Sequence, residues 1–280
     1  PRRALRAGWL GLMIAAPAGV LVTGLVYLDG PIFELMGGPP AVQALAGDYF
    51  RVRLLAAPSW FAAAALINYY QGIGDTRTPM KLNLVVNGLN VVLDLVLIFG
   101  WGPVPALGVA GAALATVLSW VVGFAAILAH FVRRHGLRPG GGLGLLGRIG
   151  RLGIPMGVRW ALDVGSFTVF AALLARMGAT ELAAHQIAIK IISLSFLPGH
   201  GIAEAACVLA GKYVGARKPH LARRSFWTAL KVSGATMGAF GLVFWTVPES
   251  LVRIFTDHRD VVALGGDLLL LAAVFQVFDA

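Results

Sequence analysis

Residues 82–100 read LNLVVNGLNVVLDLVLIFG, and this run indicates the class of protein. It is apolar over about 20 residues, the length that an α-helix needs to cross the hydrocarbon core of a bilayer. Its polar side chains, Asn83, Asn87, Asn90 and Asp94, are spaced 4, 3 and 4 residues apart. Because this spacing repeats with the period of an α-helix, the run predicts a membrane-spanning helix with one polar face.

Comparable apolar runs follow one another along the whole chain. Of the 280 residues, 58% are hydrophobic and 13% are charged, whereas soluble domains carry about 25% charge. The mean hydropathy of +0.79 is also that of a strongly apolar chain. We therefore expect an all-α polytopic membrane protein with eight spans, at residues 7–28, 54–73, 82–100, 108–130, 152–175, 184–210, 225–247 and 261–280.

The net charge of +10 is distributed unevenly between the connections. If the connections alternate sides, those at 1–6, 73–81, 131–151 and 211–224 hold 15 Lys and Arg residues, and those at 29–53, 101–107, 176–183 and 248–260 hold 5. Because cytoplasmic loops carry the excess of Lys and Arg, the first set is predicted to be cytoplasmic. The basic balance is therefore attributed to topology, and nucleic-acid binding is not expected.

An internal repeat indicates two duplicated halves. Residues 1–12, PRRALRAGWLGL, match 219–230, PHLARRSFWTAL, and residues 44–48, ALAGD, match 263–267, ALGGD. An offset of six helices is typical of parallel repeats related by an axis along the membrane normal. We expect twelve helices in two pseudo-symmetric six-helix bundles, truncated here by two helices at each end. The predicted parts are 1–135 (N-terminal bundle), 136–150 (cytoplasmic linker) and 151–280 (C-terminal bundle).

The polar face of the third span is the first candidate site. An ionisable group in hydrocarbon costs at least about 2.5–3.5 kcal/mol, so it needs a partner, water or a function. Asp94 with Asn90 is predicted to hold a proton or a hard cation. For Asn83 and Asn87 the favoured interpretation is hydrogen bonding between helices, and this alternative stays open for the other two.

The fifth span carries Arg159 and Asp163, four residues apart. Asp163 is predicted near mid-membrane, where it could handle an ion or a substrate. Arg159 lies closer to the cytoplasmic end and could extend its charge to the interface. The alternative is a simple i,i+4 ion pair.

Polar residues in two later spans are secondary candidates. Lys190 and Glu204 lie in the sixth span, too far apart to pair on a straight helix. The eighth span ends with Gln276 and Asp279, three residues apart on one face.

Other function classes find little support in the sequence. Gly142, Gly144 and Gly147 fit a dinucleotide-binding pattern, but a spanning helix and a basic loop precede them where that pattern requires a strand. The histidine spacings do not fit a zinc site, and no catalytic cluster stands out. The single cysteine, Cys207, excludes an intrachain disulfide. The chain is not expected to be an enzyme.

Several stretches, in the same order, resemble one transporter family. QGIGDTRTP (71–79), NGLNVVLD (87–94) and GVAGAALAT (108–116) resemble the N-terminal bundle of MATE (multidrug and toxic compound extrusion) transporters. In the second half, GIPMGVRWALDVGSF (153–167), MGATELAAHQIA (177–188) and VFQVFDA (274–280) look like the NorM-type branch. The resemblance covers helices three to ten of twelve.

The resemblance implies a monomeric exporter of organic cations in a bacterial inner membrane, working by antiport with H⁺ or Na⁺ and alternating access, with no other cofactor. It implies that Asn90 and Asp94 help form a proton site, and that Asp163 and Asp279 contribute to cation coordination, with Na⁺ as a candidate. Asp163 stands where the family usually carries Glu, which shortens the side chain by one methylene. Two alternatives remain: a lipid-linked-precursor flippase of the same superfamily, and a twelve-helix transporter of another fold.

Overall fold

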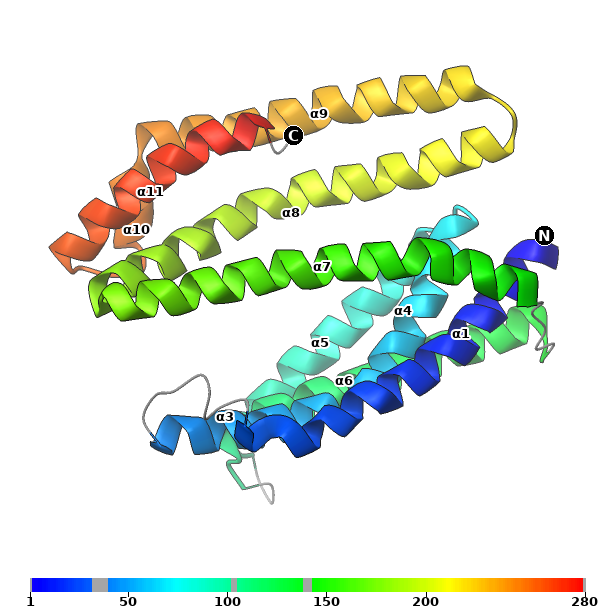
Figure 1. Ribbon diagram of the computed structural model, residues 1–280, viewed down its shortest axis with the longest axis horizontal. Coiled ribbons are helices and arrows are strands. Elements are labelled where there is room, and N and C mark those ends of the chain that lie inside the picture. Colours follow the sequence, from blue (N-terminus) through cyan, green and yellow to red (C-terminus); the bar gives the residue numbers. More distant parts are fainter. Residues whose placement is uncertain (1, 32–39, 102–104, 138–142, 279–280) are drawn as a thin grey trace. The chain divides into compact units, whose positions relative to one another are not determined.

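The computed structural model describes residues 2–31, 40–101, 105–137 and 143–278, and these residues are overwhelmingly helical (Figure 1). Within this described part, four helices are long and apolar enough to cross a membrane: Ala4–Pro31, Arg77–Phe99, Gly108–His135 and Ala179–Gly215. A bent pair, Gln43–Leu54 and Ala57–Gly72, raises the number to five if it forms one span. The predicted all-α membrane fold is confirmed.

Contacts between helices divide the chain into two compact units, Pro1–Leu152 and Gly153–Ala280. The first contains α1 (Arg2–Thr23), η1 (Gly24–Leu28), α3 (Pro40–Leu54), α4 (Ala57–Gly72), α5 (Arg77–Phe99) and α6 (Gly108–His135). The second contains most of α7 (Leu143–Met177), with α8 (Ala179–Gly215), α9 (Pro219–Thr246), α10 (Pro248–Arg253) and α11 (Arg259–Phe278). Because α7 begins at Leu143, residues 143–150 of the predicted linker are helical.

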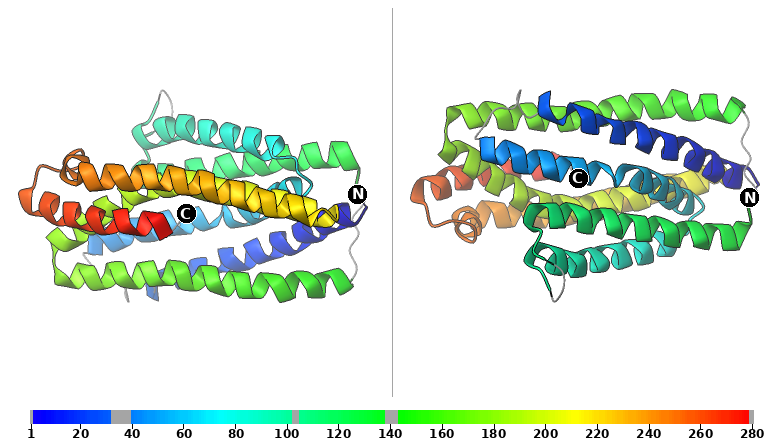
Figure 2. Two further views of the ribbon diagram at one scale, coloured as in Figure 1. Left: turned by 90° about the horizontal axis from the view of Figure 1, so that it is seen from above. Right: turned by 90° about the horizontal axis from the view of Figure 1, so that it is seen from below.

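In the first unit, α1 packs on α4, and α5 packs on α6. Figure 2 shows α5 and α6 side by side in both views. The core between these helices is aromatic: the Trp9 and Phe131 ring centroids lie 5.2 Å apart, and Tyr70 is fully buried beside them. Aromatic rings bury a large apolar area and prefer such edge contacts, so this core holds α1, α4 and α6 together at one end of the unit.

In the second unit, α8, α9 and α11 pack against one another around Ile191, Phe244 and Leu269 (Figure 1). The short α10 folds back onto α11. Along α7, by contrast, the side chains of residues 151–164 are all exposed.

The eight predicted spans fall on helices as far as residue 278, although four or five of the described helices are long and apolar enough to cross a membrane. Several predicted connections, among them 29–53, 131–151 and 248–260, also contain helix. Residues 29–53 were expected to connect two spans, yet α3 occupies 40–54 and meets α4 at a bend of 49°. Within this segment Arg51 Nε donates to Asp29 Oδ2 at 2.5 Å. The charges of α3 lower its mean hydropathy to that of a loop, but one of them, Arg51, is paired with Asp29, which lies 22 residues away in the sequence.

Candidate functional site

The close approach of α5 and α6 positions the candidate site of the first unit. Leu82 and Val86 of α5 are buried against α6. Two glycines of α6 allow this approach: Gly123 lies against the Val86 side chain, and Gly111 lies against the backbone of Leu97. A Cβ at Gly111 would lie 2.7 Å from the Leu97 carbonyl carbon, so only glycine permits this spacing. At 100° per residue, Asn90 and Asp94 lie about 40° and about 80° around α5 from Val86, on the flank of the interface.

Asn90 and Asp94 are partly buried, and each has a buried atom with no partner. Asn90 Nδ2 and Asp94 Oδ1 are shielded from solvent and accept or donate no hydrogen bond within the described residues. Buried polar atoms almost always have a partner, and an unpaired one costs about 1–3 kcal/mol. The unpaired donor, Asn90 Nδ2, and the unpaired acceptor, Asp94 Oδ1, belong to residues one helical turn apart. Together they indicate a binding position for a proton, a cation or a water molecule.

Asn87 differs from Asn90, one turn further along α5, in its exposure and in its hydrogen bonding. It is exposed, and its Nδ2 donates to the Asn83 backbone oxygen of the same helix at 2.8 Å. The amide is therefore satisfied within α5. The predicted bond between helices is therefore not the one that Asn87 makes. The structure separates two exposed residues of this face, Asn83 and Asn87, from two partly buried residues with unpaired atoms, Asn90 and Asp94.

On α7, Arg159 Nε lies 3.7 Å from Asp163 Oδ2, the i,i+4 ion pair that the spacing allows. Both side chains are exposed, Asp163 to 56% and Arg159 to 84%. A pair of this kind contributes little stability. Its contact leaves Asp163 open to other ligands.

The secondary candidates of α8 and α11 are placed in two different environments. Lys190 and Glu204 are exposed, and neither forms an ion pair within the part of the chain that is described. Gln276 is buried, and its Nε2 donates to Ser195 Oγ of α8 at 2.5 Å, while its Oε1 has no partner among the described residues. Gln276 thus ties α11 to α8. Asp279 lies outside the described residues.

Nothing in the described segments gathers three or more His, Cys, Asp or Glu side chains into a metal-binding group. The predicted Na⁺ position at Asp163 with Asp279 includes a residue that is not described. It therefore stays a prediction.

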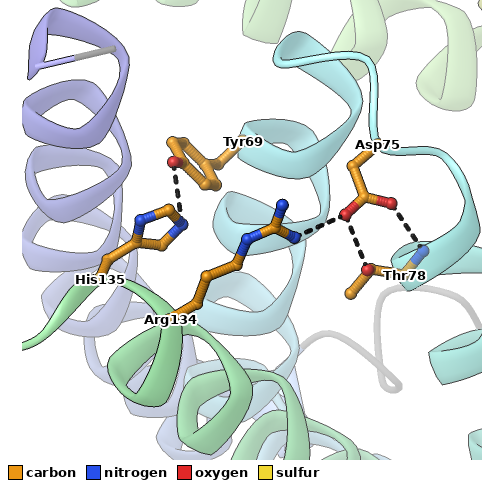
Figure 3. A network of polar contacts seen from close by, with 5 residues as sticks. All are labelled: Tyr69, Asp75, Thr78, Arg134 and His135. Atoms are coloured by element: carbon orange, nitrogen blue, oxygen red, sulfur yellow. Dashed lines mark hydrogen bonds and ion pairs between the residues drawn. The ribbon is translucent and has the colours of Figure 1, made fainter.

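A polar network at one end of the first unit was not predicted (Figure 3). Asp75, in the α4–α5 connection, accepts hydrogen bonds from the Thr78 backbone N–H at 3.1 Å and from the Thr78 hydroxyl at 2.9 Å. Arg134 Nη1, from the last turn of α6, donates to Asp75 Oδ2 at 3.1 Å. The neighbouring His135 contacts the Tyr69 hydroxyl at 3.3 Å.

Partial burial of Asp75 would raise its pKa, but the Thr78 hydrogen bonds and the Arg134 guanidinium outweigh this and hold the pKa below its usual 3.8. Asp75 therefore stays ionised and fixes the end of α6 to the start of α5. A sequence signal existed: Asp75 is the single acid in the four connections that contain 15 basic residues.

Comparisons with known proteins agree with this architecture. The MatE family model matches residues 1–96 and 155–280. The chain is 32% identical to the probable multidrug resistance protein NorM of Thermotoga maritima, covering 100% of this chain and 62% of the relative. It is 31% identical to the protein of the same name from Pseudomonas putida, over 97% of this chain and 61% of the relative. The chain thus spans about three fifths of the length of these relatives.

Solved structures show the same fold. A MOP superfamily transporter from Pyrococcus furiosus matches with a TM-score of 0.85 at 25% identity, over 98% of this chain and 62% of that structure. An outward-facing multidrug resistance MATE family transporter matches with a TM-score of 0.83 at 26% identity, over 95% and 60%. A family match over most of the chain, supported by relatives and by fold, shows that this chain belongs to the MatE family.

Proposed function

We propose that the protein containing this chain is a secondary active efflux transporter that exports organic cations by antiport with H⁺ or Na⁺. The names of the relatives as multidrug resistance proteins support drug efflux. The observation that carries the coupling proposal is the pair of unpaired buried atoms, Asp94 Oδ1 and Asn90 Nδ2.

The chemistry of this pair suits ion coupling. A carboxylate oxygen without a hydrogen bond in an apolar setting gains most from a proton or a small cation, which cancels its charge. The Asn90 amide one turn away offers a polar atom to the bound species. An organic cation and the coupling ion would neutralise the same negative charge, so binding of one disfavours the other.

Exclusive binding of this kind produces antiport only if the ion binds the two states of the transporter unequally. In the proposed cycle the two bundles alternate between inward-open and outward-open states, and the ion at Asp94 shifts their populations. Asp163, whose Arg159 contact is exposed and weak, is proposed as a second ion or substrate position in the C-terminal bundle. Asp279 is proposed to contribute there to Na⁺ binding.

The proposed setting is the bacterial inner membrane, with the basic connections in the cytoplasm and a monomer as the transporting unit. The charge asymmetry of the connections supports this orientation.

The test is transport of a fluorescent organic cation by the full-length protein in proteoliposomes, driven in turn by a pH gradient and by a Na⁺ gradient. One gradient should drive efflux, and a coupled proton should sustain about a tenfold substrate gradient per pH unit. Asp94→Asn should abolish the driven component, whereas the matched variant Asn87→Ala should keep it.

Unchanged driven efflux in both Asp94→Asn and Asp163→Asn would contradict the site assignment. If no organic cation is moved but a lipid-linked precursor is, the protein is instead the flippase that the sequence left open.

A further inference from the structure

The connection between α8 and α9 concentrates positive charge. Five basic residues lie within 13 positions, and no acidic residue occurs from 205 to 248. We call these residues the basic hairpin: Lys212, Arg217, Lys218, Arg223 and Arg224. Figure 1 shows the connection between α8 and α9 at the yellow end of this pair of helices, within the second unit.

All five side chains of the basic hairpin are exposed. The ion pairs of the described chain use Arg51, Arg134, Arg159 and Arg253, so none of the five is neutralised by a described acid. The contrast with the α4–α5 connection is direct, because there Asp75 pairs with Arg134 at 3.1 Å (Figure 3). The basic hairpin is left with its full charge available to an external anion.

The backbone of the connection adds to this field. Arg217 has a φ of 57°, a left-handed conformation that glycine or asparagine adopts more readily than arginine. Helix α9 then begins without a side-chain cap and without an acid in its first turn. Pro219 has no N–H, and the Leu221 and Ala222 N–H groups donate to the Lys218 oxygen. The helix therefore contributes the positive end of its dipole, which lies in the same connection as the five cations.

The position along the chain selects the kind of anion. Gly215 ends α8, one of the helices long and apolar enough to cross a membrane, and Arg217 follows two residues later. A cluster of basic residues directly at the end of a spanning helix lies at the level of the lipid headgroups. A soluble anion has no such reason to be bound at this level.

We infer that the basic hairpin is a binding surface for anionic phospholipid headgroups of the cytoplasmic leaflet. The inference rests on the proposed orientation of the chain, but it does not depend on the transported substrate. Each Lys or Arg near such a surface contributes about 1 kcal/mol, which is about fivefold in affinity.

The experiment titrates the delipidated full-length protein with phosphatidylglycerol or phosphatidylcholine and counts bound lipids by native mass spectrometry. The wild type should prefer phosphatidylglycerol. Arg217→Gln should weaken phosphatidylglycerol binding about fivefold, and neutralising Arg217, Lys218, Arg223 and Arg224 together should abolish the preference. Lipid binding is read without transport, so failure of this inference and failure of the proposed antiport remain distinguishable.

A matched control removes the same charge elsewhere in the predicted cytoplasmic set, by substituting Gln for Arg77, Lys81, Arg133 and Arg151. These four are exposed and unpaired within the described residues. They are spread over α5, α6 and α7 and form no single cluster, so their loss should leave most of the preference intact. Equal loss in both quadruple variants, no preference in the wild type, or displacement of the lipid by millimolar inorganic phosphate would each overturn the inference.

Discussion

Replacing Gly111 by alanine tests how the α5–α6 interface holds the candidate site. The added Cβ would lie 2.7 Å from the carbonyl carbon of Leu97 and 3.1 Å from the backbone nitrogen of Ile98. Both are backbone atoms, so no side chain can rotate away. The Leu97 carbonyl oxygen also accepts the Leu107 N–H at 2.9 Å, and the new methyl group would crowd this bond.

The size of the effect follows from these contacts. The Leu97 carbonyl oxygen would lie closer still to the new Cβ, so reaching the 3.4 Å of ordinary contact moves the two backbones apart by about 1 Å at this point. Overpacking of this kind costs about 1–3 kcal/mol. Because Leu97 lies three residues after Asp94, the shift also displaces the candidate site, and displacements of about 1 Å in active sites can cost about 100-fold in rate.

Thermal unfolding of the full-length protein in detergent, followed by circular dichroism, measures the stability, and driven efflux measures the function. Gly111→Ala should lower both. The matched control is Gly11→Ala in α1, where the nearest atom to the new Cβ would be Ala65 Cβ at 3.7 Å, an ordinary contact. This control should be neutral or stabilising by up to about 1 kcal/mol.

Equal melting temperatures and equal efflux for Gly111→Ala and the wild type would refute the reasoning, because α5 and α6 would then not be held at the spacing described. Lower stability with unchanged driven efflux would separate the packing from the site. It would show that the α6 contact does not position Asp94.

Three further predictions follow from side chains with contrasting partners. Asn90→Ala should impair driven efflux of the fluorescent cation while Asn87→Ala does not, because only the Asn90 amide is buried without a partner; equal loss in both would contradict this. Gln276→Leu should lower the melting temperature, since it removes the bond from α11 to α8, which contributes about 0.5–1.5 kcal/mol, while the Ser195 hydroxyl keeps its bond to the Ile192 oxygen; an unchanged melting temperature would show that this bond contributes nothing. Asp75→Asn should lower the melting temperature at neutral pH. The lowered pKa of Asp75 means that its stabilisation is present above pH 3.8 and is lost as the pH falls through the folded-state value, so wild type and variant should converge in acid, and a difference independent of pH would contradict the Arg134 pairing.

The sequence predicted the parts of this fold that depend on local pattern. Apolar length located α5 and α6, and the helical period put Asn90 and Asp94 on one face. The sequence pattern did not predict α3, because charged residues such as Arg51 and Asp48 lower the hydropathy of this segment. The contact between Arg51 and Asp29 forms only in the tertiary fold.

The partners of the site residues were also beyond local pattern. Asn87 and Asn90 are the same residue type on the same face, and the sequence assigned them different roles without showing which amide is buried. Their difference arises from the register of α6 against α5, which is fixed by close contacts at Gly111 and Gly123. Asp75 and Arg134, 59 residues apart, meet for the same reason. Only the charge imbalance around Asp75 pointed to this pair.

Proton release on substrate binding tests the central claim most directly. The purified full-length protein is mixed with a cationic substrate in a weakly buffered solution, at a pH where the site is protonated, and the released protons are counted. If Asp94 carries the exchanged proton, the wild type should release about one proton per molecule and Asp94→Asn none, with Asn87→Ala matching the wild type. Proton release by the wild type that Asp94→Asn retains in full would contradict the account. So would a wild type that binds substrate while releasing neither H⁺ nor, as measured with a Na⁺-selective electrode, Na⁺.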